Sequence, residues 1–146
     1  MEFADAVAIA AHAYGAGRDR SGGLLVAHGV NVAQALGPAA TPTAMNVAVL
    51  HRVPEHTLWT LDDLARRGVD PLVCEAIDVL TRRRGEPYTD YIRRVCDTPG
   101  VAGDTARLVT VADLTISFDR ADSDALRERY EQSLPLLQSA LAPTVA

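Results

Sequence analysis

Apolar residues recur along this chain every three to four positions, and no segment sustains the alternation of apolar and polar residues expected of a strand. The first apolar stripe comprises Phe3, Val7, Ala10 and Tyr14. After a glycine-rich loop, the second comprises Leu25, Gly29, Val32 and Leu36. Both have the spacing of one helix face, so the pattern predicts two N-terminal helices. Gly15 and the Gly37-Pro38 pair provide their stop signals.

Capping signals divide the middle of the chain. Thr41-Pro42 predicts the start of a third helix, which Val53-Pro54 should end or kink close to His51. The next helix is short, with an approximate capping box from Thr60 to Asp63 and an end at Gly68. Asp70-Pro71 should cap the helix after it. We expect its inward side chains to be Leu72, Ala76, Val79 and Leu80.

Three further helices complete the prediction. One begins near Thr89, and the next spans Thr105 to Phe118 after a break at residues 98–100. Ser123 should cap the last helix, which Pro135 should kink. The apolar face of that helix comprises Leu126, Tyr130, Leu134, Leu137 and Leu141. The expected fold is all-α, a compact bundle of about seven to eight helices forming one domain over residues 1–146.

Composition narrows the function class. Hydrophobic residues make up 48% and charged residues 23% of the 146 residues, and no apolar run reaches the roughly 20 residues of a membrane span. A net charge of -5 disfavours a nucleic-acid surface, which needs clustered Lys and Arg. Cys74 and Cys96 lack metal-ligand or disulfide-scaffold spacing. Since the N-terminus has no basic leader, we expect a cytoplasmic protein. The lack of a long apolar run and the negative net charge predict no membrane or nucleic-acid partner.

Four segments carry a family resemblance, and they occur in the order that the family shows. They are AHAYGAGRDRSGGLLVAH, VAVLHRVPEHTLWTLDDL, AIDVLTRRRGEPYTDYIRRV and LVTVADLTISFD. Together they resemble the HD superfamily of metal-dependent phosphohydrolases, in the branch similar to bacterial guanosine tetraphosphate hydrolases. The resemblance covers about residues 3 to 141. It implies a helical bundle of the HD type and an active site at the matching positions.

The resemblance implies a metal site that this chain has altered. In members with intact motifs, two His, the Asp of a His-Asp pair and a late Asp bind one divalent cation that activates water. The matching positions here are His28, His51, residue 52 and Asp113, and residue 52 is arginine. A guanidinium has no lone pair to donate and stays protonated. At about 4 Å, its charge would cost roughly 8 kcal/mol against a divalent cation at an effective dielectric of about 20.

Other matching positions are also changed. The Glu-Asp pair that assists water activation in the resembling hydrolases is Glu55-His56 here. Arg18 keeps a residue type suited to binding a phosphorylated ligand, whereas His12 has the ordinary reading of a helix-face histidine. We expect Arg52 to form an ion pair with Asp113 or Glu55, because a bidentate pair can join helices that a metal would otherwise link.

Three functions remain open on this basis. The first is a pseudoenzyme or a domain in which Arg18, His28 and Arg52 bind a small anionic or phosphorylated molecule, with no cofactor. The second is a metal-independent enzyme. Its acid-base residues would be His51, Glu55, His56 and Asp113. The third is a surviving phosphohydrolase acting on a nucleotide polyphosphate with Mn, Fe or Zn, whose remaining ligands are His28, His51 and Asp113. A homodimer is compatible with each.

Overall fold

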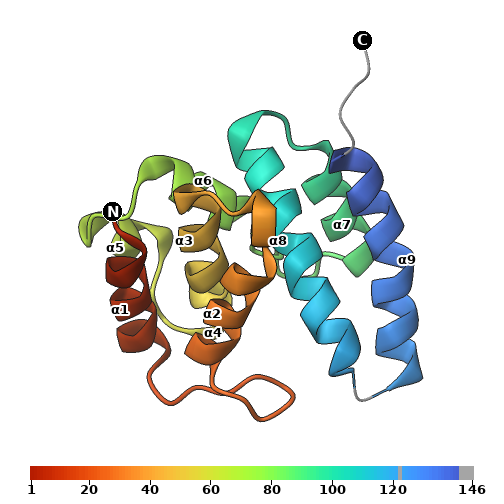
Figure 1. The fold of residues 1–146 in the computed structure, drawn as a ribbon, viewed down its shortest axis with the longest axis horizontal. Helices are drawn as coiled ribbons and strands as arrows, with labels where there is room; N and C mark the ends of the chain where they lie inside the picture. The colour runs from red at the N-terminus through yellow and green to blue at the C-terminus, as the bar shows by residue number, and fades with distance from the viewer. Residues whose placement is uncertain (122, 142–146) are drawn as a thin grey trace.

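The computed structural model describes residues 1–121 and 123–141, and this part of the chain is built from nine α-helices and one 3-10 helix (Figure 1). The α-helices are α1 (Phe3–Tyr14), α2 (Leu25–Ala35), α3 (Pro42–Leu50), α4 (Val53–His56), α5 (Leu61–Arg66), α6 (Pro71–Leu80), α7 (Tyr88–Asp97), α8 (Gly100–Asp119) and α9 (Asp124–Leu141). The 3-10 helix η1 spans Gly37–Ala39. The predicted all-α class is confirmed. No helix among the described residues is long and apolar enough to cross a membrane.

Several predicted caps are present. The Thr41 hydroxyl accepts a hydrogen bond from the backbone N–H of Ala44 at 3.0 Å, which starts α3. Thr60 and Asp63 form a complete capping box at the start of α5. The Ser123 hydroxyl accepts from the backbone N–H of Leu126 at 3.2 Å. Side chains that satisfy free N–H groups fix where helices begin, so these boundaries were readable from short motifs.

Proline explains the helix that the sequence analysis did not separate. Helix α3 ends at Leu50, and Val53–His56 forms α4 with Pro54 in its first turn. Proline has no N–H and favours a first-turn position, so it starts a new helix here and does not continue the old one.

Three details of the prediction were wrong. Asp70 occupies the N-cap position of α6, but its side chain forms no capping hydrogen bond. Helix α8 begins at Gly100 and not at Thr105; the glycines at 100 and 103, directly after Thr98-Pro99, had indicated a break there. Helix α6 buries a slightly rotated face, and its buried residues are Val73, Ala76, Ile77 and Leu80. Leu72 and Val79 are only partly buried. Helix α9 continues through Pro135, so the kink expected there stays a prediction.

The helices pack in two neighbouring groups (Figure 1). Helices α1, α2, α3, α5 and α6 lie on one side, and α7 and α9 lie on the other with α8 between them. Helix α8 packs against α2, α3, α6 and α9, so it contacts both groups. Glycine allows α2 to approach α3, since a Cβ at Gly29 would lie 2.9 Å from the carbonyl oxygen of Val49. This close packing brings the His28 end of α2 next to the C-terminal end of α3.

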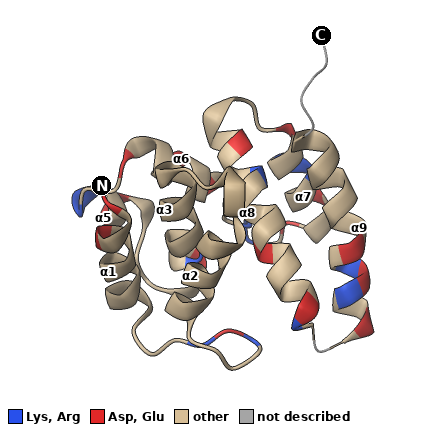
Figure 2. Ribbon diagram, in the orientation of Figure 1, with Lys and Arg blue, Asp and Glu red and all other residues tan. Residues whose placement is uncertain are grey.

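Charged residues of both signs are interspersed along α9 (Figure 2). The basic run at residues 82–84 follows the end of α6. There the Arg83 guanidinium donates to the carbonyls of Asp78 and Thr81, both at 2.7 Å. These are carbonyls of the last helical turn and its cap, so this arginine stabilises the negative end of the helix dipole. Its position agrees with the ordinary structural reading of the basic run.

A bidentate ion pair closes the loop between α6 and α7. The Arg94 guanidinium donates to both carboxylate oxygens of Glu86 at 3.0 Å, and also to the carbonyls of Val79 and Thr81. The hydrogen bonds from Arg94 are the main reason that the pKa of Glu86 falls to about 2. The loop is therefore held by a carboxylate that stays ionised in mild acid.

We expect this pair to make stability depend on pH in the acid range. The folded-state pKa of Glu86 lies below the ordinary value of 4.5, so its contribution is complete above pH 4.5 and is lost as pH falls towards 2. The difference in unfolding free energy between wild type and Glu86→Gln, measured by urea denaturation, should shrink across that range. A difference that stays constant from pH 5 to pH 2 would contradict the assignment.

Candidate functional site

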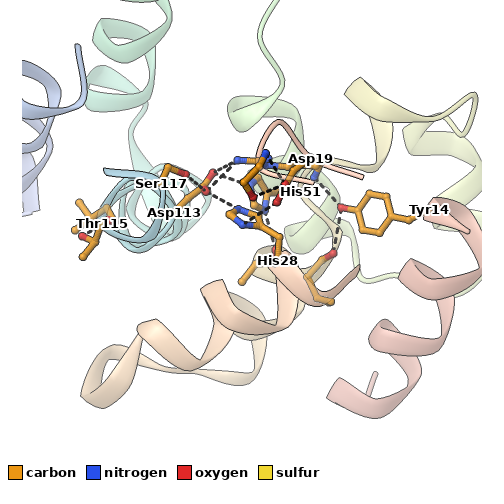
Figure 3. Close-up of polar contacts among 12 residues, drawn as sticks. Tyr14, Asp19, His28, His51, Asp113, Thr115 and Ser117 are labelled. Carbon is orange, nitrogen blue, oxygen red and sulfur yellow. Dashed lines mark hydrogen bonds and ion pairs between the residues drawn. The ribbon is translucent and has the colours of Figure 1, made fainter. Parts of the chain in front are cut away.

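Asp113, on α8, lies at the centre of a cluster that joins three helices (Figure 3). Its Oδ1 is 2.7 Å from Nε2 of His28 on α2, and its Oδ2 is 3.2 Å from Nε2 of His51 at the end of α3. One terminal nitrogen of Arg52 donates to Oδ1 at 3.1 Å and to Oδ2 at 3.2 Å. The Ser117 hydroxyl, one turn further along α8, donates to Oδ1 at 3.2 Å. The carboxylate is thus contacted by four side chains.

The charges in this cluster are complementary. Burial alone would raise the pKa of the Asp113 carboxyl, but the Arg52 charge and the hydrogen bonds from both histidines hold it well below its usual range. Burial opposes the charge of Arg52, and the neighbouring Asp113 nevertheless raises the Arg52 pKa. The two side chains are only 22% and 17% exposed, so this ion pair is partly shielded from water. The pairing expected between Arg52 and Asp113 is present.

Backbone contacts fix His51 and Arg52 in place. Nδ1 of His51 lies 2.7 Å from the carbonyl of Ala48. Because a carbonyl oxygen can only accept, Nδ1 carries a proton and the other ring nitrogen, Nε2, faces Asp113. The Tyr14 hydroxyl, on α1, donates to the carbonyl of Val49 and accepts from the backbone N–H of Arg52, both at 3.2 Å. A buried tyrosine therefore ties α1 to the turn that carries both site residues.

Tyr14→Phe is expected to destabilise the fold by about 1–2 kcal/mol, because the substitution keeps the ring and leaves a buried carbonyl and N–H without their partner. The loss should appear as a lower urea midpoint in a denaturation experiment followed by circular dichroism. Tyr130→Phe is a matched control, since Tyr130 is only partly buried on α9. Equal midpoints for wild type and Tyr14→Phe would show that these two hydrogen bonds contribute no net stability.

The side chains present do not fit a divalent metal in this arrangement. Both histidine Nε2 atoms face the carboxylate oxygens of Asp113, and the Arg52 guanidinium bridges those same oxygens. No group of three or more His, Cys, Asp or Glu side chains in the described residues has a geometry that could hold a metal ion. The Asp113 carboxylate, which a metal would need as a ligand, is already paired with the fixed positive charge of Arg52. A metal would have to displace Arg52 to enter.

Other residues expected at the site lie further out. The Glu55 carboxylate is exposed and accepts a hydrogen bond from the backbone N–H of Arg82 at 2.6 Å, because Pro54 starts a new helix and turns Glu55 away from the face of His51. Much of the His56 side chain is exposed. Burial of the rest of the ring and the nearby positive charge of Arg52 both lower the His56 pKa. In the part of the chain that the structure describes, neither side chain forms a hydrogen bond with Asp113.

The two N-terminal candidates have local contacts. Arg18 is exposed and donates to the carbonyl of Gly22 at 2.7 Å within its own loop. The ring of His12 packs edge-on against Trp59, with centroids 5.6 Å apart, which agrees with the ordinary reading of a helix-face histidine. Arg18 therefore stabilises the loop that follows α1, and its side chain is not among those lining the pocket described next.

A pocket opens on one side of Arg52, and we call it the Arg52 pocket. It is lined by Asp19, Arg20, Ser21, His28, Arg52, Ser117, Arg120, Ala121, Leu126 and Tyr130. Three guanidinium groups and three hydroxyl groups line it, which are donor types that suit phosphate oxygens. The sequence analysis missed Arg20, Ser21 and Arg120 as site residues. Of the lining residues, His28 and Arg52 were predicted as ligand-binding residues from the family resemblance.

A second pocket lies on the other side of Arg52, and we call it the tyrosine pocket. It is lined by His51, Arg52, Leu80, Tyr88, Tyr91, Ile92, Thr110, Asp113, Leu114, Ser117 and Tyr130. Arg52, Ser117 and Tyr130 belong to both pockets, so these three side chains separate a cationic space from an aromatic one. Tyr88, on α7, belongs to the third segment of the family resemblance, whereas Tyr130, on α9, belongs to none of the four segments.

We compared the chain with protein-family models, curated proteins and solved structures. Among solved structures, the chain is similar to a metazoan ortholog of SpoT that hydrolyzes ppGpp and plays a role in starvation responses. The match has a TM-score of 0.75 and 19% sequence identity, and covers 97% of this chain and 86% of that chain. This chain has the HD-domain fold. Neither the protein-family models nor the curated proteins provide a match.

The HD fold is shared, and the identity is too low for the similarity to extend beyond the fold. The predicted HD-type architecture is confirmed. In this HD fold, helices α2, α3 and α8 converge on Asp113, where the two histidines and Arg52 meet. The chemistry of the cluster follows from this chain's own residues, and it centres on an arginine–carboxylate pair.

Proposed function

We propose that this HD-fold domain binds a small phosphorylated molecule without a metal and has lost the hydrolase chemistry of the fold. One observation carries the proposal. The Arg52 guanidinium contacts both oxygens of Asp113 between His28 and His51, where a divalent cation would need those ligands. The fixed positive charge can neutralise the carboxylate and hold three helices together, yet it cannot activate water as a metal does.

The lining of the Arg52 pocket supports an anionic ligand. Arg20 and Arg120 line the same space as Arg52, and Tyr130 adds a hydroxyl group. Guanidinium groups bind phosphate oxygens through charge-assisted hydrogen bonds, which are about twice as strong as neutral ones. Arg52 remains partly exposed at 22%, so it can contact a ligand while it stays paired with Asp113. A phosphate group is the ligand chemistry that these donors favour.

The adjoining tyrosine pocket extends the proposal to a ligand with a ring. Tyr88, Tyr91 and Tyr130 offer aromatic surface beside the cationic space, and aromatic side chains stack well on planar groups. The similar metazoan protein hydrolyzes ppGpp, a small phosphorylated nucleotide. We propose the same broad ligand class, a phosphorylated nucleotide, for this chain.

The alternative of metal-free acid-base catalysis has less support. It needs Glu55 and His56 beside His51 and Asp113, whereas the Glu55 carboxylate is engaged with the backbone of Arg82. The alternative of a surviving metal-dependent hydrolase needs Arg52 to leave Asp113. Both predict turnover of a phosphorylated substrate, and the binding proposal predicts none.

Isothermal titration calorimetry with ppGpp in EDTA tests the proposal. We expect one ligand to bind per chain without metal, and no release of pyrophosphate when Mn²⁺ is added. Arg120→Ala should weaken binding about tenfold, the effect of roughly 1.4 kcal/mol from one charged contact. Arg66→Ala is the matched control, because Arg66 is 77% exposed on α5, outside both pockets. Hydrolysis that requires added metal would overturn the proposal, as would an absence of binding.

A further inference from the structure

The loop between α1 and α2 contains a nearly buried carboxylate, although the loop itself lies on the surface. The Asp19 side chain is only 9% exposed, and it lines the Arg52 pocket together with its neighbours Arg20 and Ser21. We infer that Asp19 is a positioning residue, which fixes this loop so that Arg20 faces the ligand. The inference deepens the proposed function and rests on it.

The contacts of Asp19 explain how it fixes the loop. Its Oδ1 accepts three hydrogen bonds: from the backbone N–H of Ser21 at 2.9 Å, from the Ser21 hydroxyl at 2.7 Å and from the backbone N–H of Gly23 at 3.1 Å. Its own backbone N–H and carbonyl are paired with Gly23 and Gly22. One side chain therefore satisfies the polar groups of a turn that packs little apolar surface.

The second carboxylate oxygen faces the central cluster. Oδ2 of Asp19 lies 3.9 Å from Nδ1 of His28, and the other ring nitrogen of His28 contacts Asp113. The loop is thus aligned with the same histidine that meets the Arg52–Asp113 pair. Burial would raise the pKa of Asp19, but its hydrogen bonds with Ser21 and Gly23 lower it, so the carboxylate is ionised at neutral pH.

A negative charge in a pocket for anions needs an explanation. Coulomb repulsion from Asp19 alone would weaken phosphate binding, so a carboxylate without another role would be unfavourable there. The explanation is that the three hydrogen bonds it accepts from Ser21 and Gly23 fix the loop that carries Arg20, whose guanidinium lines the pocket. The charge of Asp19 weakens phosphate binding, whereas its hydrogen bonds to the loop strengthen it. Substitutions that remove one and keep the other can therefore distinguish the two effects.

The test compares Asp19→Ala with Asp19→Asn, using inorganic pyrophosphate in EDTA as the probe. Alanine removes both the charge and the acceptor, whereas asparagine removes the charge and keeps an acceptor oxygen for Ser21 and Gly23. Positioning predicts that alanine weakens pyrophosphate binding about tenfold and that asparagine binds at least as tightly as wild type. Asp62→Ala, on exposed α5, makes the same change in net charge away from the pocket.

Amide hydrogen exchange gives a second readout that needs no ligand. The Ser21 and Gly23 amides should exchange faster in Asp19→Ala than in wild type, and asparagine should restore protection. Pyrophosphate binding by Asp19→Ala that equals or exceeds wild type would overturn the role of Asp19, as would equal weakening by both variants or unchanged exchange. If wild type itself does not bind pyrophosphate, the proposed function fails instead, and the exchange data separate that failure from a failure of the loop assignment.

Discussion

Asp113→Ala is expected to be the most destabilising single substitution at the site, with a loss of about 3–5 kcal/mol in the free energy of unfolding. Removing one partner of a shielded ion pair leaves the other charge without compensation. Here the loss would strand the Arg52 guanidinium and the inward-facing nitrogens of His28 and His51, since all three contact this one carboxylate. Urea denaturation at pH 7 measures the effect.

Asp119→Ala provides the matched control for that measurement. Asp119 is exposed at the end of the same helix, so its removal changes net charge equally without touching the cluster. We expect a change within about 0.5 kcal/mol, as is usual for surface substitutions. Similar losses for the two variants would mean that the Asp113 cluster does not stabilise the junction of α2, α3 and α8.

Arg52→Asp is expected to create a divalent metal site at the Asp113 cluster. The substitution removes the guanidinium from Asp113 and supplies a second carboxylate beside His28 and His51, a ligand set suited to first-row divalent ions. Removing a repulsion of roughly 8 kcal/mol and adding a ligand both favour binding. Metal analysis after dialysis against Mn²⁺ should find about one equivalent per chain in the variant.

Two further variants show which of these effects matters. Arg52→Ala removes the positive charge without adding a ligand, so it should bind Mn²⁺ more weakly than Arg52→Asp. Arg66→Asp makes the same charge change on α5, where Arg66 is 77% exposed, and should bind none. If Arg52→Asp gains no metal, the identity of residue 52 is not what closes this site.

Local signals predicted the fold well. The Thr41 cap and the Thr60 capping box set helix starts from two or three residues each, and both are present. Predictions failed where the signal was weak. The first turn of α8 contains two glycines and directly follows the Thr98-Pro99 break signal, and the buried face of α6 is rotated because several adjacent positions are apolar. An apolar stripe along a helix does not determine which of its residues the neighbouring helices bury.

The centre of the candidate site could be predicted, and its surroundings could not. His28, His51 and Asp113 belong to motif segments, and the charge of Arg52 made Asp113 a natural partner. Arg120, by contrast, reaches the pocket because α8 ends there, and Arg20 because the α1–α2 loop folds back. Such positions depend on tertiary packing. The displacement of Glu55 follows from Pro54, which the sequence analysis recognised as a break without fixing its direction.

The Arg52 guanidinium contacts Asp113 between His28 and His51, where we propose that it takes the place of a metal cation. Calorimetric titration with Mn²⁺ of metal-free wild type and of His51→Ala tests this replacement. We expect wild type to show no Mn²⁺ binding that depends on His51, so the two titrations should give the same small heats. One equivalent of Mn²⁺ bound by wild type and lost in His51→Ala would contradict it.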